Sequence, residues 1–266
     1  NSNKSKSNFI RVEKNYRKNG FVIIKNFINK KIIQDIRNEL TNKKKNNKFF
    51  YYKTIKKEKK LRRIERISDF SKKSKHLICS IEILKIIENL EKSKYELLKD
   101  KLNFKYPGGR GYLPHIDGHF YWRDRSNKVK KGWSVYSNNF TNVVIPLERT
   151  DENNGCLFVS SKKNIKKLGK NWNQVTNKLD KFTPNIKKKY LNNFKFTPAI
   201  LKAGDILFFD WYCAHKSIKN YSNKSRMIFY ATYCAKNNKI RDIRKKYYYD
   251  KKFSKNNKLI KSLQFN

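Results

Sequence analysis

The sequence predicts an α+β fold whose core is an antiparallel β-barrel or jelly roll. Before Tyr95 the apolar residues recur at helical spacing, whereas after it they fall in short runs separated by turn residues. One pair of runs, residues 142–147 and 156–160, is separated by a polar segment ending in Asn154-Gly155, which predicts a β-hairpin. Helices first and many short strands afterwards are typical of this fold class.

The N-terminal part predicts helices that flank the core. Residues 1–15 are expected to form a poorly ordered polar lead, and residues 16–266 a single domain. Residues 16–27 predict the end of a helix, a stop at Gly20 and a β-branched strand. Asn29 is expected to cap the next helix. The apolar residues of that helix fall at helical spacing: Ile32, Ile33, Ile36 and Leu40.

The remaining elements follow from the same periodicities. Residues 61–67 predict a strand, and one amphipathic helix should follow, with His76 at its start as a capping or surface residue. The apolar side of this helix comprises Leu77, Ile81, Leu84 and Leu90. Residues 123–142 predict a long loop or lid, and residues 162–190 an insertion of helix and loop. Two further strands are expected within residues 199–210 and 227–234.

The formal net charge of +44 raises the question of nucleic-acid binding. Lysine is spread along the whole chain and is enriched together with asparagine and isoleucine, as in a protein from an AT-rich genome. The densest basic run, residues 43–60 with four aromatics, fits either a strip that binds single strands or a solvated loop and strand. We expect nothing beyond non-specific charge attraction to nucleic acid.

The cysteines and the hydropathy indicate a cytoplasmic protein. The four cysteines lie without metal-type or disulfide-type spacing and are expected to be reduced and mostly buried: Cys79, Cys156, Cys213 and Cys234. No run approaches the roughly 18 apolar residues of a membrane span, and no signal peptide opens the chain. The sequence does not indicate an oligomeric state.

A candidate metal site follows a glycine- and proline-rich segment, residues 106–114. His115 and Asp117 lie two apart, so on an extended strand both side chains would point to the same face. One further imidazole would complete the two-histidine, one-carboxylate set that binds non-haem Fe(II). His76, His119 and His215 are available, and we select His215 because it lies near the end of an apolar strand.

The chain resembles the phytanoyl-CoA dioxygenase superfamily of Fe(II)- and 2-oxoglutarate-dependent oxygenases, from about residue 16 to residue 252. The most specific segment is residues 215–226, which is similar to the family's distal segment of His, Ser, Asn, Ser and Arg. Residues 20–27 and 154–159 also resemble family elements. Within the superfamily, residues 101–112 and 230–251 are similar to the dioxygenases of 2-aminoethylphosphonate and its trimethylated relative.

The resemblance implies a double-stranded β-helix (cupin-like) core and a hydroxylase with O2 as co-substrate. It implies that His115, Asp117 and His215 hold Fe(II), and that Arg226 binds the far carboxylate of 2-oxoglutarate. Further candidates for holding 2-oxoglutarate are Ser222, Asn103 and Lys105. The related halogenases lack the carboxylate ligand, so its presence here favours hydroxylation.

The resemblance implies a small-molecule substrate, which we expect to be a small anionic metabolite, with an organophosphonate first. Candidate substrate contacts lie near the metal pair: Arg110, His119, Tyr121, Trp122 and Arg123. Residues 118–122 depart from the phosphonate pattern, which leaves substrate identity open. The alternatives are an oxygenase that acts on a nucleic acid or another macromolecule, and a non-catalytic basic β-barrel that only binds.

Overall fold

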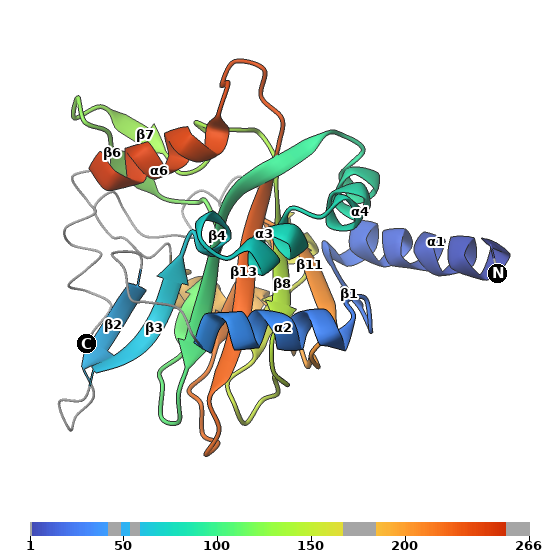
Figure 1. The fold of residues 1–266 in the computed structure, drawn as a ribbon. Helices are drawn as coiled ribbons and strands as arrows, with labels where there is room; N and C mark the ends of the chain where they lie inside the picture. The colour runs from blue at the N-terminus through green and yellow to red at the C-terminus, as the bar shows by residue number, and fades with distance from the viewer. Residues whose placement is uncertain (1, 42–48, 54–58, 167–184, 254–266) are drawn as a thin grey trace.

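Two antiparallel sheets form the core of the structure, a computed structural model that describes residues 2–41, 49–53, 59–166 and 185–253 (Figure 1). In spatial order the larger sheet contains β1 (Phe21–Ile24), β11 (Ile206–Asp210), β8 (Phe140–Pro146), β13 (Arg226–Ala235), β4 (Tyr95–Lys105), β3 (Lys59–Glu65) and β2 (Phe49–Lys53). The smaller contains β10 (Phe196–Pro198), β9 (Leu157–Ser160), β12 (His215–Ser217) and β5 (Tyr112–His115). Apolar side chains of both sheets pack in one cluster between them. The predicted α+β class and its jelly-roll, double-stranded β-helix core are confirmed.

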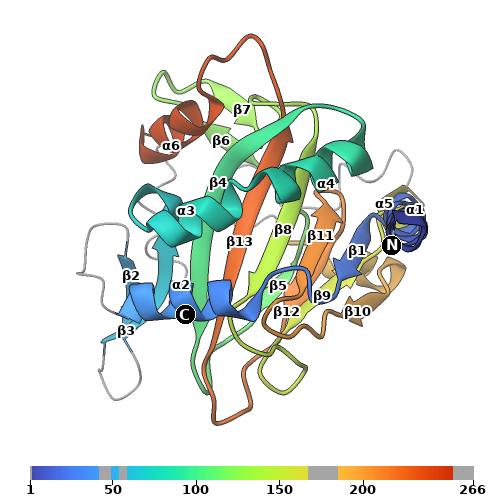
Figure 2. The ribbon, with the colours of Figure 1, turned by 45° about the vertical axis from the view of Figure 1, so that its right-hand side comes forward.

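Helices cover the outer face of the larger sheet, whereas its inner face points toward the smaller sheet. α2 (Lys30–Thr41), α3 (Lys72–Ile78) and α4 (Ile81–Glu91) lie across this outer face (Figure 2), and α1 (Ser2–Asn19) projects from one side (Figure 1). α6 (Ile243–Phe253) lies beside the short hairpin of β6 (Tyr121–Arg123) and β7 (Val129–Lys131). Three short helices, η1 (Ile67–Asp69), α5 (Lys163–Lys166) and η3 (Lys188–Asn193), complete the described elements. No helix in the described ranges is long and apolar enough to cross a membrane.

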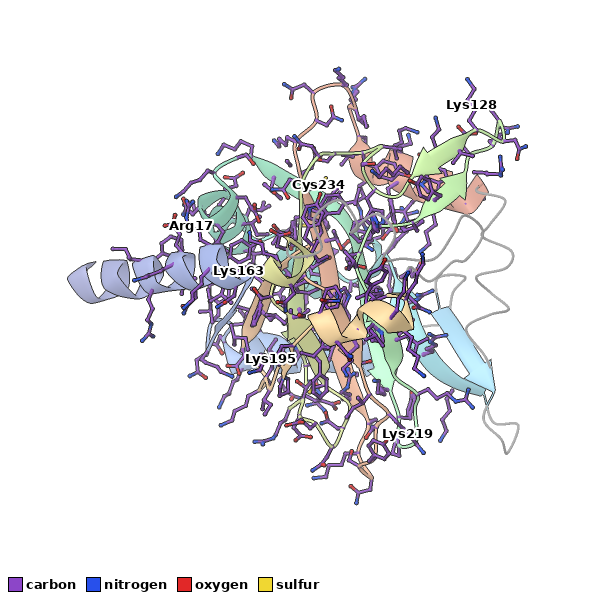
Figure 3. The ribbon with its side chains drawn as sticks, turned by 180° about the vertical axis from the view of Figure 1, so that it is seen from behind. Arg17, Lys128, Lys163, Lys195, Lys219 and Cys234 are labelled. Atoms are coloured by element: carbon purple, nitrogen blue, oxygen red, sulfur yellow. The ribbon has the colours of Figure 1, made fainter. Side chains whose placement is uncertain are left out.

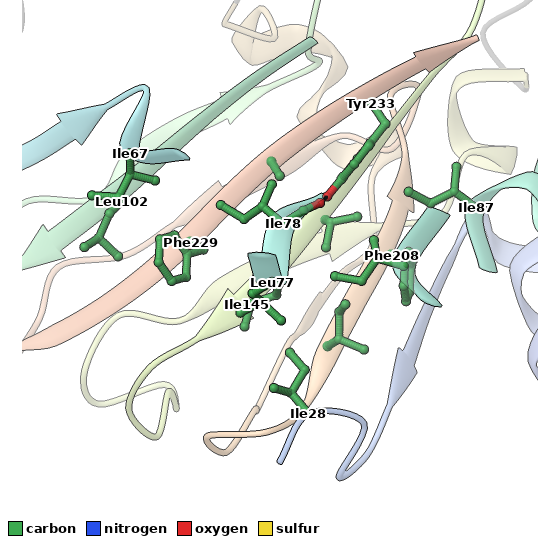
Figure 4. Close-up of a cluster of buried hydrophobic side chains, with 14 of the residues drawn as sticks. Ile28, Ile67, Leu77, Ile78, Ile87, Leu102, Ile145, Phe208, Phe229 and Tyr233 are labelled. Carbon is green, nitrogen blue, oxygen red and sulfur yellow. Dashed lines mark hydrogen bonds between the residues drawn. The ribbon is translucent and has the colours of Figure 1, made fainter. Parts of the chain in front are cut away.

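The largest apolar cluster lies between these helices and the larger sheet (Figure 4). On β13, Phe229 and Tyr233 point into this cluster, whereas Ile228 points between the sheets, as strand alternation requires. Ile78 and Ile87 of α3 and α4 are fully buried against them. Each such side chain contributes about 1.5–3 kcal/mol by leaving water. The helices therefore fix the larger sheet from outside, while alternate residues of the same strands remain available for the interior.

Three N-terminal features agree with the sequence-based predictions: the helix stop at Gly20, the strand after it and the cap at Asn29. α1 ends at Asn19, and Gly20 follows with a φ of +80°, a conformation that side chains rarely adopt. β1 follows, and the Asn29 side chain accepts a hydrogen bond from the Lys31 amide at 2.8 Å, as expected of a helix cap. Residues 2–15, which the sequence predicts as a poorly ordered lead, form the first part of α1, and the order of this segment stays a prediction.

The single helix expected after residue 67 is two helices. Cys79 and Ser80 separate α3 from α4, and the Ser80 hydroxyl caps the new helix by accepting from the Ile83 amide at 3.4 Å. The apolar periodicity continues across this break, which is why the sequence pattern did not reveal it. His76 is exposed in the last turn of α3, not at a helix start.

The hairpin predicted across Asn154-Gly155 is wrong. β8 pairs with β11 and β13, whereas β9 pairs with β10 and β12, so the two strands belong to different sheets. The turn itself forms, and the Asn154 side chain accepts from the Asp151 amide at 2.9 Å. The connection is long enough to carry the chain from one sheet to the other. A local turn signal cannot distinguish these two outcomes.

Residues 123–142, expected to be a long loop or lid, partly form strands and buried packing. It contains β7 and the start of β8, and Trp133 and Tyr136 are buried in a cluster with Phe140 and Trp211. All four cysteines are free; three are buried and Cys79 is exposed, which agrees with the expected thiols. The basic run of residues 43–60 lies largely outside the described side chains.

Candidate metal centre

Two histidines a hundred positions apart in the chain lie directly opposite each other on neighbouring strands. His115 of β5 pairs with His215 of β12, and their ring centroids are 4.1 Å apart. A carboxylate oxygen of Asp117 lies 3.7 Å from Nε2 of His215. One potential ligand atom from each of the three residues lies within 4.8 Å of the other two. The predicted triad is thus brought together by strand pairing.

Local backbone geometry places His115 and Asp117 on the same side. β5 ends at His115, so Asp117 lies just beyond the strand, but the alternation persists because Ile116 between them is buried in a separate apolar cluster. Gly111 permits close approach of β5 to β12, since a Cβ there would lie 1.9 Å from the carbonyl oxygen of Ser217. The pairing that aligns the histidines therefore requires glycine at position 111.

Both imidazole rings are fixed by backbone carbonyls. Nδ1 of His115 lies 2.7 Å from the Leu113 carbonyl oxygen, and Nδ1 of His215 lies 3.1 Å from that of Cys213. A protonated Nδ1 donates to each carbonyl, which leaves Nε2 with a lone pair for a metal. Burial, followed by the neighbouring His215, lowers the pKa of His115 to about 3. The ring is therefore neutral near pH 7, as a metal ligand must be.

The Asp117 carboxylate is likewise ionised without a metal. Burial opposes its charge, but His215, Lys99 and His115 outweigh burial and lower its pKa to about 2. Two imidazoles and an ionised carboxylate form the donor set that suits Fe(II) with open coordination positions. The residues present therefore fit this metal.

Sequence reasoning missed Asn142, which orients the carboxylate. Its side-chain amide donates to Asp117 Oδ2 at 3.0 Å, and its carbonyl oxygen accepts from the Thr232 hydroxyl at 2.7 Å. Asn142 is a buried amide in the wholly buried strand β8. A polar residue inside an otherwise apolar run was the available signal, because such a group needs buried partners.

Two cations lie side by side where β13 and β4 pair. Arg226 is opposite Lys105 in the register, and both are buried. Arg226 Nε donates to the Asn154 carbonyl at 2.9 Å, and Lys105 Nζ donates to the Ile218 carbonyl at 2.7 Å. Burial, with Arg226 beside it, lowers the pKa of Lys105 to about 6. The Arg226 guanidinium with the Lys105 amine beside it fits the far carboxylate of a dicarboxylate ligand, because a bound carboxylate favours the charged form of the lysine.

The other two residues expected to hold 2-oxoglutarate have different surroundings. Asn103 lies on the same face of β4 as Lys105, and its side-chain oxygen is buried without a hydrogen-bond partner in the described part of the chain. Ser222 lies in the turn before β13, where its hydroxyl donates to the Asn220 side chain at 2.8 Å. The geometry thus offers Asn103 for a ligand and gives Ser222 a turn-forming contact.

The expected substrate contacts lie outside the metal cluster and are divided between interior and surface. Trp122 is buried, and its Nε1 donates to the Gly132 carbonyl at 2.9 Å, which fits packing. Arg123 donates to the Asn127 carbonyl at 3.1 Å within the β6–β7 hairpin. His119 is buried, and burial followed by Lys131 lowers its pKa to about 4. The remaining two candidates, Tyr121 and Arg110, are exposed.

The jelly roll and the two-histidine, one-carboxylate cluster define the class of non-haem iron oxygenases. The sequence model of the phytanoyl-CoA dioxygenase (PhyH) family matches residues 16–228. The chain belongs to this family. It is a 2-oxoglutarate-dependent non-haem iron dioxygenase, and its cofactors are Fe(II) and 2-oxoglutarate.

Among its relatives is a 2-aminoethylphosphonate dioxygenase from uncultured bacterium HF130_AEPn_1, 26% identical over 226 residues, with 82% of this chain and 78% of the relative covered. A methylphosphonate hydroxylase from Gimesia maris is 32% identical over 158 residues, with 59% of this chain and 52% of the relative covered. The crystal structure of EctD from S. alaskensis with 2-oxoglutarate and 5-hydroxyectoine has a TM-score of 0.64 at 14% identity, with 85% of this chain and 75% of that chain covered. This structural likeness supports the fold.

Proposed function

We propose that the enzyme hydroxylates a small anionic metabolite, with an organophosphonate as the leading substrate class. The observation that carries the reaction is the cluster of His115, Asp117 and His215 in the same interior as the buried Arg226 and Lys105. The substrate class is supported by the two relatives named for phosphonates. Proteins that share a fold can differ in substrate, so the fold alone does not identify the substrate class.

Each residue of the site has a defined part in this proposal. His115, Asp117 and His215 hold Fe(II), which together with 2-oxoglutarate supplies the oxidising chemistry that inserts oxygen into a substrate C–H bond. Asn142 keeps the Asp117 carboxylate oriented through its amide. Arg226 and Lys105 fix the far carboxylate of 2-oxoglutarate through charge-assisted hydrogen bonds. The apolar walls next to the cluster, among them Phe209 with its ring centroid 5.0 Å from that of His215, limit access of water.

The test is substrate-coupled succinate formation with Fe(II), ascorbate and 2-oxoglutarate. We expect 2-aminoethylphosphonate, its trimethylated form or methylphosphonate to stimulate succinate formation above the substrate-free rate. A panel of phosphorus-free carboxylates serves as the comparison. Stimulation by a carboxylate alone would sink the phosphonate proposal and leave the dioxygenase class in place.

A pair of histidine variants tests the metal assignment in the same assay. His215→Ala removes a ligand and should abolish iron-dependent succinate formation, whereas His76→Ala removes an exposed histidine on α3 and should retain it. Iron content of the purified variants should follow the same order. Full activity of His215→Ala, or loss of iron in His76→Ala, would show that the cluster is assigned wrongly.

A further inference from the structure

Two lysines of β4, Lys99 and Lys101, lie two positions apart on the inner face that also carries Asn103 and Lys105. We propose that these two ammonium groups form the subsite that binds the phosphonate group of the substrate. This inference rests on the proposed function and deepens it, because it assigns the anionic end of the substrate to two residues that are distinct from those facing 2-oxoglutarate.

Lys99 is connected to the metal centre through an aromatic ring. Its Nζ lies 3.7 Å from the ring centroid of Trp133. The ring of Trp133 packs against Gly118, where a Cβ would lie 2.9 Å from the nearest ring carbon. Gly118 follows the ligand Asp117 directly, so this contact chain brings the Lys99 ammonium next to the metal centre. The Lys99 charge also stabilises the ionised form of Asp117.

Lys101 occupies the next position along the same face. Its Nζ lies 5.5 Å from the ring centroid of Tyr230, which is also its partner in the β4–β13 register. In the same register, Lys101 lies between the Arg226–Lys105 pair and Lys99. Alternate residues on a strand are roughly 6.5–7 Å apart, and two long lysine side chains at that spacing can converge on one oxyanion.

Among the described residues, neither ammonium group lies within salt-bridge distance of a carboxylate; both lie over the faces of aromatic rings. The nearby Glu65 is already engaged, at 2.7 Å by Lys251 and at 3.1 Å by Arg63. Burial lowers the pKa of Lys99 to about 7 and also lowers that of Lys101. Two half-buried cations without a carboxylate are costly, and a bound anion would offset that cost.

The charge balance favours a dianion over a monoanion. Around the metal centre, four cationic side chains face two carboxylates: Lys99, Lys101, Arg63 and Lys251 against Glu65 and Asp117. Bound Fe(II) and 2-oxoglutarate have opposite charges of equal size, and the buried Arg226 and Lys105 add to the positive side, so an excess of at least two positive charges remains. A phosphonate brings up to two negative charges and three acceptor oxygens, whereas a carboxylate brings one charge and two oxygens.

The test measures affinity by anaerobic calorimetry, with protein loaded with Fe(II) and 2-oxoglutarate. The ligands are 2-aminoethylphosphonate and 3-aminopropanoate, its carboxylate counterpart. Lys99→Met and Lys101→Met should each weaken phosphonate binding roughly ten- to hundred-fold, because each removes a charged hydrogen bond. They should weaken carboxylate binding less. Lys101→Arg, which keeps the charge, should restore most of the affinity, and Lys236→Met, which removes an exposed charge beyond the end of β13, controls for net charge.

The outcomes separate this inference from the proposed function. Wild-type enzyme that forms iron-dependent succinate, with methionine variants that melt normally and bind the phosphonate as tightly as wild type, would overturn the subsite alone. Equal weakening for phosphonate and carboxylate would also overturn it. If the methionine variants do not fold, competition decides: inorganic phosphate should displace 2-aminoethylphosphonate from the wild type, and failure to do so rejects the subsite. Wild-type protein that forms no succinate with any ligand would instead reject the proposed function.

Discussion

Arg226 shows how backbone carbonyls can hold a guanidinium ready for an anion. Its Nε and one terminal nitrogen donate to the Asn154 and Gly155 carbonyls, and Lys105 donates to the same Gly155 carbonyl at 3.3 Å. The turn between the sheets therefore positions both cations. Because the carbonyls carry no net charge, the pair keeps its attraction for a carboxylate.

At this scale we predict that Arg226→Leu raises the dissociation constant of 2-oxoglutarate roughly ten- to hundred-fold through loss of charged hydrogen bonds. Ser222→Ala is the matched comparison, since its hydroxyl bonds to Asn220 and the Lys224 carbonyl within the turn. We expect it to bind 2-oxoglutarate nearly as wild type does. Calorimetry on folded protein measures both. An unchanged constant in Arg226→Leu would transfer the role to Lys105.

At the scale of elements, the sequence predicted those features that depend only on residues close together in the chain. Gly20 ended a helix and Asn29 capped the next. The candidate metal triad was identified because His115 and Asp117 lie two positions apart and His215 lies in a distinctive segment. The partner sheet of β9 was not predictable, because the same turn serves a hairpin or a crossing between sheets.

Site residues that depend on strand register escaped the sequence. Asn142 donates to Asp117 from β8, which pairs with β13, and Lys99 of β4 lies over the ring of Trp133. Conversely, Trp122 lies beside the metal pair in sequence but packs in an apolar cluster. Proximity along the chain identified the candidate metal ligands. It did not identify the side chains around them, because long-range strand pairing determines which side chains lie there.

The docking of α6 gives a prediction for this scale. Lys251 of α6 binds the buried Glu65 of β3, and although burial opposes the Glu65 charge, Lys251 and Arg63 lower its pKa to about 2 from 4.5. Stability from this pair is present above the unfolded-state pKa and is lost as pH falls toward the folded-state pKa. We expect Lys251→Met to destabilise the fold by roughly 1–3 kcal/mol at neutral pH.

The pH dependence of melting checks that expectation. Between about pH 5 and about pH 3, the melting temperature of the wild type should fall more steeply than that of Lys251→Met, because the variant no longer depresses the Glu65 pKa as strongly. Lys245→Met, which removes an exposed lysine of α6, should behave as wild type. Parallel melting curves for wild type and Lys251→Met across this range would contradict the assignment.

At the scale of the whole molecule, the positive charge is distributed widely. Lys128 on the β6–β7 hairpin, Lys195 before β10 and Lys219 after β12 lie at well-separated points (Figure 3). Basic groups on the surface are accompanied by local carboxylates in several places, such as Lys130 with Asp124 at 3.4 Å. The interior cations of β4 and β13 differ, because they lie on the inner face of the larger sheet. In our proposals these interior cations bind small anions, whereas the charge on the surface is spread.

We therefore predict that binding to nucleic acid is weak and sequence-blind. A chain with a net charge of +44 should bind duplex or single-stranded DNA at low salt by counterion release, with an affinity that falls steeply as salt increases. At physiological ionic strength little association should remain, and oligonucleotides should not stimulate succinate formation. Fluorescence anisotropy over a salt series, with oligonucleotides of different sequence, measures the first point, and the succinate assay measures the second. Tight binding at physiological salt together with base oxidation would instead make a macromolecule the substrate.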